Sequence, residues 1–331
     1  MKIAILTSGI RPVPAVQGGA VENLIDFYLE YNEQHRLHDI TVYSLWHPDA
    51  ERHQALGAEA NHYIYIKTNT IWGKIKKKLY QQTRPKGYYH PSIEYFLHEV
   101  LRRMSGRHFD TVIIENRPAF ILQLKHSPTT RYILHLHNDF LNAETPKAAQ
   151  ILSGYDRVVS VSDYISRRVQ TAGPAASQCL TVHNAIDTKL FQEARPLSRS
   201  TIGLQPDDFV IVYSGRMIPE KGILPLIQAV KQLSVPNIRL LVIGASAYGH
   251  DKHPTPYIRQ LQQEAEAMKD QVVFTGFVPY PQIPAYLKTA NLAVVPSLWE
   301  EPFGLTVVEA MAAGRPLITT RSGGIPEICE G

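Results

Sequence analysis

The sequence predicts an α/β protein made of two doubly wound domains in tandem. Three observations lead to this prediction. The chain has 331 residues, which suits two domains better than one. Short β-branched apolar runs alternate with longer amphipathic segments, as in repeated strand–helix–strand units around a parallel sheet. The pattern is interrupted over residues 193–207 by prolines, serines and charged residues, which indicates a linker.

Each apolar run is expected to form one strand, and helices are expected between most of them. In the first half these runs are residues 2–7, 40–45, 63–66, 111–114, 132–136, 157–161 and 180–182. In the second half they are residues 209–213, 239–243, 272–275, 292–296 and 317–320. The linker places the domain boundary near residue 198, giving domains 1–198 and 199–331. Ligands of such sheets bind beyond the carboxyl ends of the strands, so polar residues at those positions are candidate site residues.

Composition excludes several classes of protein. Hydrophobic residues make up 44% and charged residues 19% of the chain, which argues against disorder, collagen and coiled coil. The net charge of +4 is too small to predict a nucleic-acid partner. Residues 1–198 carry +5 and residues 199–331 carry −1, so an anionic partner is expected at the first half. With two cysteines, no apolar leader and no run of 18 apolar residues, the chain is predicted to be soluble and cytoplasmic.

The strongest motif is the segment from Glu301 to Pro316, which follows a predicted strand and opens a helix. The first amides of that helix, at Gly304, Leu305 and Thr306, form a ready anion site. Glu301 precedes the helix and Glu309 lies inside it, and carboxylates suit vicinal hydroxyls because their oxygens only accept hydrogen bonds. Glu309 could instead be a surface residue, but the flanking sequence disfavours that interpretation.

A second motif, residues 214–222, follows the first strand of the second half. A glycine turn there places Arg216 and Lys221 at the strand end, where two cations could neutralise a diphosphate. A solvated helix start is the alternative interpretation. No Lys-Ser or Lys-Thr follows the glycines, so a P-loop nucleotide triphosphatase is disfavoured.

The first half contributes two further candidates. Gly18 and Gly19 precede a predicted helix and permit close approach of a phosphate or sugar to the backbone. Dinucleotide binding is poorly supported because the segment is not GxGxxG and no acidic residue ends the second strand. His137 lies just past a strand end, whereas His135 lies within the strand, so His137 is the favoured functional residue. A structural turn is the alternative.

At these residues the chain resembles the retaining glycosyltransferases of family 4, of bacterial polysaccharide or lipopolysaccharide type. The family's signature of Glu, seven residues and Glu is matched by Glu301 and Glu309, with the Pro-Phe-Gly context intact. The resemblance implies a GT-B fold, in which two Rossmann-like domains face a cleft. It also implies that Glu309 binds the ribose of a nucleotide sugar and that Glu301 and His137 lie at the donor sugar.

The resemblance assigns further residues to the site. The catalytic residues so implied are His137, Glu301, Arg216 and Lys221. The donor-binding residues so implied are Gly18, Gly19, Arg216, Lys221, Phe277, Val278, Glu301, Phe303, Gly304, Leu305, Thr306 and Glu309, with Phe277 and Val278 near the base.

We therefore predict a hexosyltransferase that moves a sugar from a UDP- or GDP-linked donor to a glycan or lipid-linked hydroxyl, with retention. No Asp-x-Asp occurs, so no metal is expected, and the nucleotide sugar is a substrate rather than a cofactor. Two alternatives stay open, a sugar-nucleotide epimerase and an inactive nucleotide-sugar-binding module. The second gains weight because the chain ends at Gly331, before the helix that usually crosses back to the first domain, so a truncated second domain is expected.

Residues 72–89 interleave basic and aromatic side chains, from Trp72 through the lysines to Tyr88 and Tyr89. This composition suits peripheral contact with an anionic membrane at the inner face of the plasma membrane, or with a lipid-linked acceptor. A solvated helix is the alternative. A second run, His250–His253, is expected to be a solvated loop rather than a metal site.

Overall fold

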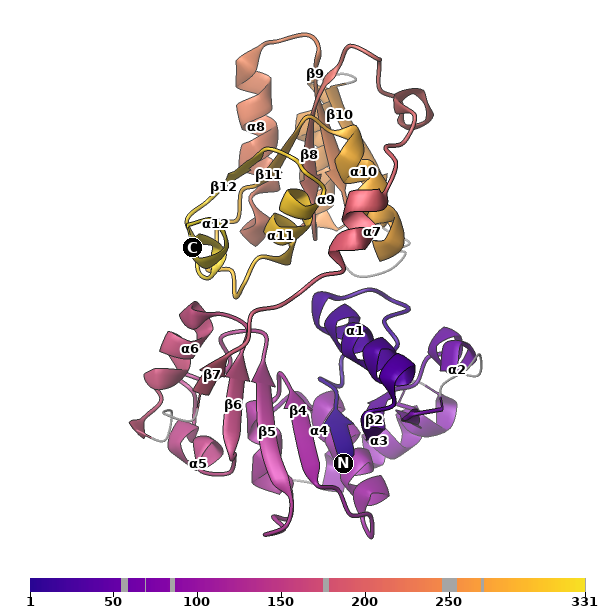
Figure 1. The fold of residues 1–331 in the computed structure, drawn as a ribbon, viewed down its shortest axis with the longest axis vertical. Helices are drawn as coiled ribbons and strands as arrows, with labels where there is room; N and C mark the ends of the chain where they lie inside the picture. The colour runs from indigo at the N-terminus through magenta and orange to yellow at the C-terminus, as the bar shows by residue number, and fades with distance from the viewer. Residues whose placement is uncertain are drawn as a thin grey trace. The chain divides into compact units, whose positions relative to one another are not determined.

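A computed structural model describes residues 1–54, 59–68, 70–83, 87–174, 179–245, 255–268 and 271–330 (Figure 1). The chain forms two compact units, Met1–His183 and Asn184–Gly331. Each unit is built around its own parallel sheet, as the sequence predicts. The run His250–His253 lies outside the described residues.

The first unit contains a seven-stranded parallel sheet in the order β3-β2-β1-β4-β5-β6-β7. The order reverses direction between β1 and β4, which makes the carboxyl ends of these two strands the topological switch point of the sheet. The strand bounds are β1 Lys2–Leu6, β2 Asp39–Leu45, β3 Asn61–Ile66, β4 Thr111–Glu115, β5 Arg131–Leu136, β6 Arg157–Ser160 and β7 Cys179–Thr181.

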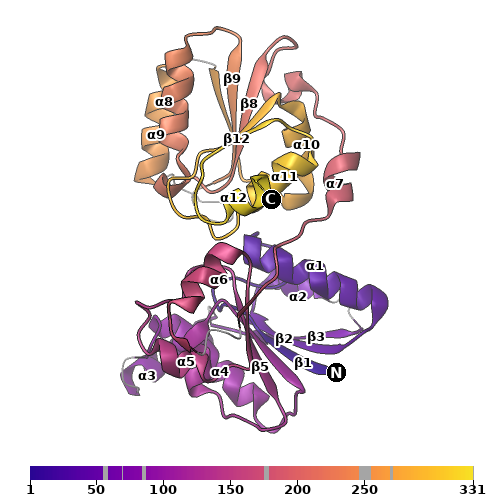
Figure 2. The same ribbon diagram turned by 60° about the vertical axis from the view of Figure 1, so that its left-hand side comes forward.

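Helices cover the first sheet, because strands buried on both faces need an apolar layer on each side. Ile25 and Leu29 of the longest helix pack on Ile3 and Ile5, which alternation places on one face. Figure 2 shows α1 and α4 on opposite sides of the strands. The helices are α1 Ala20–His35, α2 Pro48–Gln54, α3 Ile71–Thr83, α4 Pro91–Met104, α5 Ala148–Leu152 and α6 Asp163–Gln170, with a 3-10 turn at Pro118–Gln123.

The second unit contains a five-stranded parallel sheet in the order β10-β9-β8-β11-β12. Its switch point lies between β8 and β11. The strands are β8 Phe209–Ser214, β9 Ile238–Ile243, β10 Val272–Gly276, β11 Leu292–Val295 and β12 Leu317–Thr319. The helices are α7 Thr188–Glu193, α8 Ile223–Leu233, α9 Pro256–Glu266, α10 Ile283–Thr289, α11 Leu305–Ala312 and α12 Ile325–Cys329, with 3-10 turns at Arg199–Ile202, Pro219–Lys221 and Tyr280–Gln282.

Alternation along β8 separates the two cores of the second unit. Val210 and Val212 pack against α7, α10 and α11, whereas Ile211 and Tyr213 pack against α8 and α9. Figure 2 shows α8 and α9 together on one side of this sheet and α10 and α11 on the other. Successive side chains of one strand therefore hold both helical layers.

All twelve predicted strands are present, each within two residues of the predicted bounds. The boundary between the units differs from the predicted one: the chain divides after His183, earlier than residue 198. The reason is α7, whose Phe191 is fully buried in the core of the second unit with Leu204 and Val210. A helix this short carries too little apolar periodicity to be recognised in the sequence.

Candidate functional site

The switch point of the second sheet brings two predicted motifs together, because the loops that follow β8 and β11 start from neighbouring strands. The amide of Leu298 donates to the carbonyl of Glu220 at 2.8 Å, which links the two loops directly. Gly222 has φ +70°, and a Cβ there would lie 1.9 Å from the carbonyl oxygen of Pro296. Only glycine allows this close approach of α8 to the end of β11.

Lys221 and Glu301 form an ion pair at this point. Lys221 Nζ lies 2.5 Å from Glu301 Oε1, and the Ser297 hydroxyl donates to the same oxygen at 2.5 Å. The side chains of Lys221 and Glu301 are only 17% and 6% exposed. The ammonium also lies 5.3 Å from the ring centroid of Trp299, close enough for a cation–π contact. The two predicted residues are therefore in contact, and Ser297 and Trp299 are partners that the sequence analysis missed.

Glu301 is also held from its main chain. Gly324 donates its amide to the Glu301 carbonyl at 2.8 Å, and a Cβ at Gly323 would lie 2.0 Å from that carbonyl oxygen. Gly304, with φ +103°, caps α11, so the amides of Leu305 and Thr306 open the helix without a preceding carbonyl to bond. Phe303 is buried beside this turn. The two neighbouring loops thus provide amides, a cation and a carboxylate at one end of the sheet.

Glu309 lies inside α11 and is buried. Burial raises the pKa of Glu309 to about 7, and a hydrogen bond with Tyr280 opposes the rise. Burial, with the Glu309 carboxylate beside it, raises the pKa of the Tyr280 hydroxyl above its usual range, so the hydroxyl keeps its proton and is the donor. Tyr280 follows β10, so this bond ties the loop after β10 to α11. The Glu309 carboxyl group therefore changes between its neutral and its ionised form near neutral pH.

Arg216 and the pair Phe277-Val278 lie at the ends of β8 and β10. The carbonyl of Arg216 accepts a hydrogen bond from the hydroxyl of Tyr213 at 2.8 Å, which fixes the main chain there. Val278 is buried in the core of the second unit, so its side chain packs inward rather than lying open to a base. The expectation that Phe277 and Val278 lie near the base stays a prediction.

Gly18 and Gly19 precede α1 in the first unit, as predicted. Gly19 has φ +124° and forms the helix N-cap, and a Cβ there would lie 2.2 Å from Glu22 Oε2 and 2.5 Å from an Arg11 nitrogen. Glu22 is buried, which raises its pKa, while Arg11 opposes the rise from 3.7 Å. The glycine turn therefore packs directly against an acidic side chain.

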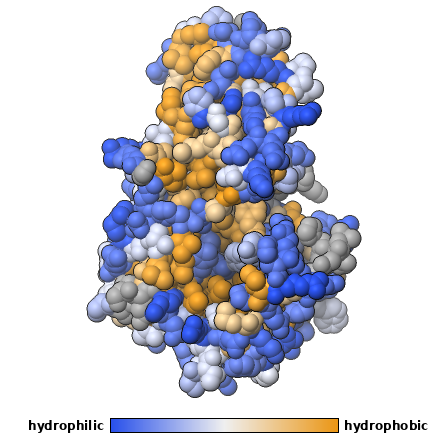
Figure 3. All heavy atoms as spheres, in the orientation of Figure 1, coloured by the Kyte–Doolittle hydropathy of each residue, from blue (hydrophilic) through white to orange (hydrophobic). Residues whose placement is uncertain are grey.

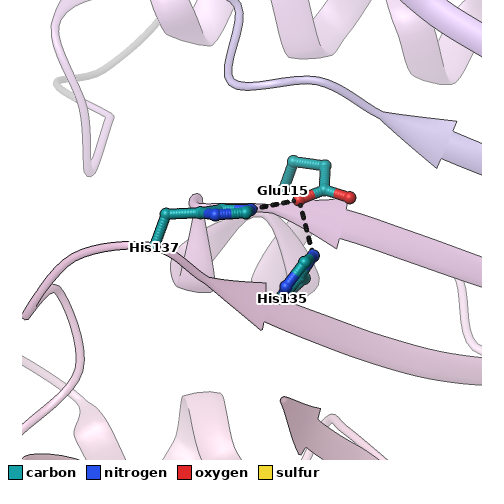
Figure 4. A group of neighbouring side chains, drawn as sticks. All are labelled: Glu115, His135 and His137. Atoms are coloured by element: carbon teal, nitrogen blue, oxygen red, sulfur yellow. Dashed lines mark hydrogen bonds and ion pairs between the residues drawn. The ribbon is translucent and has the colours of Figure 1, made fainter. Parts of the chain in front are cut away.

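His137 lies next to a carboxylate at the switch point of the first sheet. Its Nε2 is 2.8 Å from Glu115 Oε2, and His135 Nδ1 is 3.2 Å from the same oxygen (Figure 4). Glu115, the last residue of β4, has no solvent exposure. Burial alone would raise the pKa of Glu115, but the two histidines hold it below its usual range. Burial, with His135 beside it, lowers the pKa of His137, whereas Glu115 overcomes burial to raise that of His135.

Glu115 was missed by the sequence analysis, although a signal was present. It is an acidic residue at the carboxyl end of a buried apolar strand, the position that pointed to His137. The ligand atoms of Glu115, His135 and His137 lie within 4.8 Å of one another, so the trio has the donors of a two-histidine, one-carboxylate metal site. The expectation of a metal-independent protein stays a prediction.

Comparison with known proteins identifies relatives of this chain. Residues 194–330 match the family model described as glycosyl transferases group 1. Spore coat protein SA of Bacillus subtilis is 29% identical, over all of this chain and 83% of its own length. The lipopolysaccharide 1,2-N-acetylglucosaminetransferase of Salmonella typhimurium is 27% identical over 65% of this chain and 56% of its own length.

Solved structures show the same fold. Anabaena HepE, solved in complex with UDP and glucose, superposes with a TM-score of 0.69 at 20% identity, over 99% of this chain and 83% of its own. The two parallel-sheet units thus match the GT-B architecture. Over residues 194–330 the chain is therefore similar to the group 1 glycosyltransferases, and its similarity to spore coat protein SA extends over the whole chain.

Proposed function

We propose that this protein is a group 1 glycosyltransferase, which transfers a hexosyl group from a nucleotide sugar to a hydroxyl of a glycan or lipid-linked acceptor, with retention of configuration and without a metal. The observation that carries the proposal is the contact between Lys221 and Glu301 at the switch point of the second sheet. Ligands of doubly wound sheets bind at such points. The names of the relatives agree, since one is a lipopolysaccharide sugar transferase and another binds UDP and glucose.

The groups that follow β8 and β11 each suit one part of a nucleotide sugar. The Lys221 ammonium and the first amides of α11 supply positive charge for a leaving diphosphate, as electrostatic stabilisation of the transition state requires. Arg216 supplies a second cation at the end of β8. The Glu309 carboxylate, once ionised, can accept hydrogen bonds from both hydroxyls of a ribose. Glu301 holds Lys221 through one oxygen and retains a second for sugar hydroxyls.

A retaining transfer needs the new bond to form on the face that the diphosphate leaves. The acceptor oxygen attacks the anomeric carbon, the bond from that carbon to the phosphate oxygen breaks, and a phosphate oxygen takes the acceptor's proton. No protein nucleophile is required in this step. The role of the protein is to hold the diphosphate and to neutralise the charge that develops on it.

The test begins with thermal shift across UDP- and GDP-linked sugars, followed by transfer and donor hydrolysis assays with and without EDTA. We expect one donor to stabilise the protein and to be consumed at the same rate in EDTA. Loss of turnover in EDTA would contradict the metal-independent mechanism. Binding without transfer or hydrolysis would favour an inactive binding module, and interconversion of donor sugars would favour an epimerase.

We also propose that α3 contacts an anionic membrane surface. Ile71, Trp72, Ile75 and Leu79 of this helix are 79%, 73%, 46% and 57% exposed. Apolar patches also occur on the largely hydrophilic face drawn in Figure 3, so exposed apolar residues alone would carry little weight. In α3 they accompany four lysines, and no acidic residue occurs between Glu59 and Glu94. None of the helices in the described ranges is long and apolar enough to cross a membrane.

Vesicle sedimentation tests this contact. Each cation near an anionic surface contributes about 1 kcal/mol, so three Lys→Gln changes in α3 are expected to weaken binding to phosphatidylglycerol vesicles by roughly a hundredfold. The control carries the same three changes at exposed lysines elsewhere, Lys125, Lys147 and Lys231. Equal binding of both variants, or wild-type binding to phosphatidylcholine alone, would contradict the proposal.

A further inference from the structure

Glu115 has a hydrogen-bond partner on each of its oxygens. The Tyr28 hydroxyl of α1 donates to Oε1 at 2.7 Å. The other oxygen, Oε2, faces His137 Nε2 at 2.8 Å and His135 Nδ1 at 3.2 Å (Figure 4). An ionised carboxylate only accepts hydrogen bonds, so the facing atom must be a donor in each pair. Both carboxylate oxygens therefore accept hydrogen bonds, and the donors come from α1, from β5 and from the turn after β5.

This contact decides which nitrogen of His137 carries a proton. With Nε2–H directed at Glu115, the neutral imidazole has only a lone pair on Nδ1. The ring is buried, and a second proton on Nδ1 would have no acceptor there, so the contacts favour the neutral ring. His137 Nδ1 is itself buried and has no hydrogen-bond partner. A buried acceptor without a donor is unfavourable, and in native proteins it commonly marks a group that meets a ligand.

The main chain of His137 is held separately from its side chain. Asn116, at φ +58°, accepts the His137 amide through its Oδ1 at 3.2 Å and donates its own amide to the His135 carbonyl at 2.8 Å. These bonds fasten the ends of β4 and β5 together without involving the imidazole ring. Glu115 therefore orients the ring, while Asn116 fixes the backbone, and the two functions can be separated by mutation.

We propose that Glu115, held by Tyr28, is a positioning residue that fixes His137 as the Nε2–H tautomer and leaves Nδ1 as an acceptor for a ligand hydroxyl group. The proposal rests on the proposed function only in taking that hydroxyl to belong to a sugar. The tautomer and the unpartnered Nδ1 follow from the contacts of the first unit alone. A metal bound by Glu115, His135 and His137 would instead need a lone pair on His137 Nε2 and on His135 Nδ1. Neither nitrogen could then carry the proton that it donates to the carboxylate.

The test is ¹⁵N NMR of the histidine rings in the full chain, with His137 assigned by loss of its signals in His137→Gln. We expect Nε2 to be protonated and Nδ1 unprotonated without ligand, and the Nδ1 resonance to move when the nucleotide sugar found by thermal shift is added. An Nδ1–H tautomer would overturn the proposal. Zinc binding at stoichiometric concentration, with loss of both N–H signals, would also overturn it.

Three variants separate positioning from a general structural role. Glu115→Leu removes the acceptor and is expected to give mixed tautomers and about a tenfold lower kcat/KM, as for the loss of one hydrogen bond. Glu115→Gln keeps an oxygen acceptor and is expected to restore the Nε2–H tautomer and most of the kcat/KM. Tyr28→Phe frees the carboxylate and is expected to give an intermediate result.

The outcomes distinguish this proposal from the proposed function. If the wild-type protein transfers no sugar but shows the expected tautomer, the function fails and the positioning role of Glu115 stands. If Glu115→Leu keeps the wild-type tautomer and kcat/KM, the positioning role fails whether or not sugar is transferred. Should Glu115→Leu not fold, failure of Glu115→Gln to keep the Nε2–H tautomer would be the contradicting result.

Discussion

The ammonium of Lys221 lies 2.5 Å from the carboxylate oxygen Oε1 of Glu301, although the two residues are 80 positions apart in the chain. Their approach follows from topology, because β8 and β11 are neighbours and each residue lies in the loop that follows its strand. The carboxylate keeps the cation in place before any ligand arrives. A flexible lysine is thereby held at one position, which reduces the entropy lost when a diphosphate binds.

Replacing Lys221 by Ala is expected to lower turnover on saturating donor by tenfold or more. The physical reason is loss of a charge-assisted bond to the leaving group, which contributes about 1.5 to 3 kcal/mol. Lys231→Ala is the matched control, because Lys231 is an exposed lysine of α8 that faces Glu264 at 3.8 Å. Steady-state transfer rates measure both. Near-normal turnover of Lys221→Ala would refute the assigned role.

Gly222 is expected to be essential for the geometry of this loop. Gly222→Ala places a methyl group 1.9 Å from the Pro296 carbonyl and also strains a φ of +70°. The matched control is Gly203→Ala, where φ is +76° and nothing lies within 4 Å of the added Cβ. The control is expected to lose about 1 kcal/mol of unfolding free energy from φ alone, and Gly222→Ala roughly 3 kcal/mol or more. Equal losses in urea denaturation would show that the loop tolerates the approach.

The strands were predictable because each is a short apolar run bounded by turn residues, and alternation then fixes which side chains face each helical layer. The resulting order of strands also explains why the two loops at each switch point could be proposed as site segments. In the second unit, Lys221, Glu301 and Glu309 were all identified from local patterns around glycine turns and a helix start.

The contacts that position these groups were not predictable. Tyr28 reaches Glu115 across 87 residues, and no local spacing indicates such a pair. Tyr280 likewise reaches Glu309 only because the loop after β10 folds onto α11. Phe191 was assigned to the first domain because its helix spans six residues, too few to show a period. Partner choice in these cases is decided by tertiary packing rather than by residues nearby in the sequence.

Asp26 makes the stability of the first unit depend on pH. Burial raises its pKa from 3.8 to about 7, despite a hydrogen bond from the Ala15 amide at 2.7 Å. The folded protein therefore binds a proton that the unfolded chain releases, and this contribution is complete below about pH 3.8 and lost as pH rises to about 7. Asp26→Asn keeps an acceptor for Ala15 but cannot ionise.

We therefore expect the unfolding free energy of Asp26→Asn, relative to wild type, to increase between pH 5 and pH 8, by about 1 kcal/mol or more. Urea denaturation at several pH values measures the difference. Glu144→Gln is a suitable control, since Glu144 is an exposed carboxylate of the first unit and is not among the groups that raise the pKa of Asp26. A difference between Asp26→Asn and wild type that is constant with pH would show that Asp26 does not titrate in this range.

Glu309 is expected to make donor binding stronger as pH rises, whereas the contribution of Asp26 to stability falls. Its pKa of about 7 means that much of the free protein carries a neutral carboxyl group below that pH. A ribose diol needs two acceptors, and only the ionised carboxylate offers both oxygens as acceptors. Nucleotide-sugar affinity should therefore rise by roughly tenfold as pH increases from 6 to 8. The reason is that the apparent affinity is proportional to the fraction of free protein in which Glu309 is ionised.

The measurement is titration calorimetry with the donor that stabilises the protein, at pH 6, 7 and 8. Glu309→Gln should bind weakly at every pH, because its amide offers one acceptor and cannot change charge. Tyr280→Phe provides the diagnostic variant. It removes the hydrogen bond that lowers the pKa of Glu309, so the rise in affinity should shift to higher pH while its size is retained. An unchanged pH profile in Tyr280→Phe, or a pH-dependent Glu309→Gln, would mean that another group controls binding.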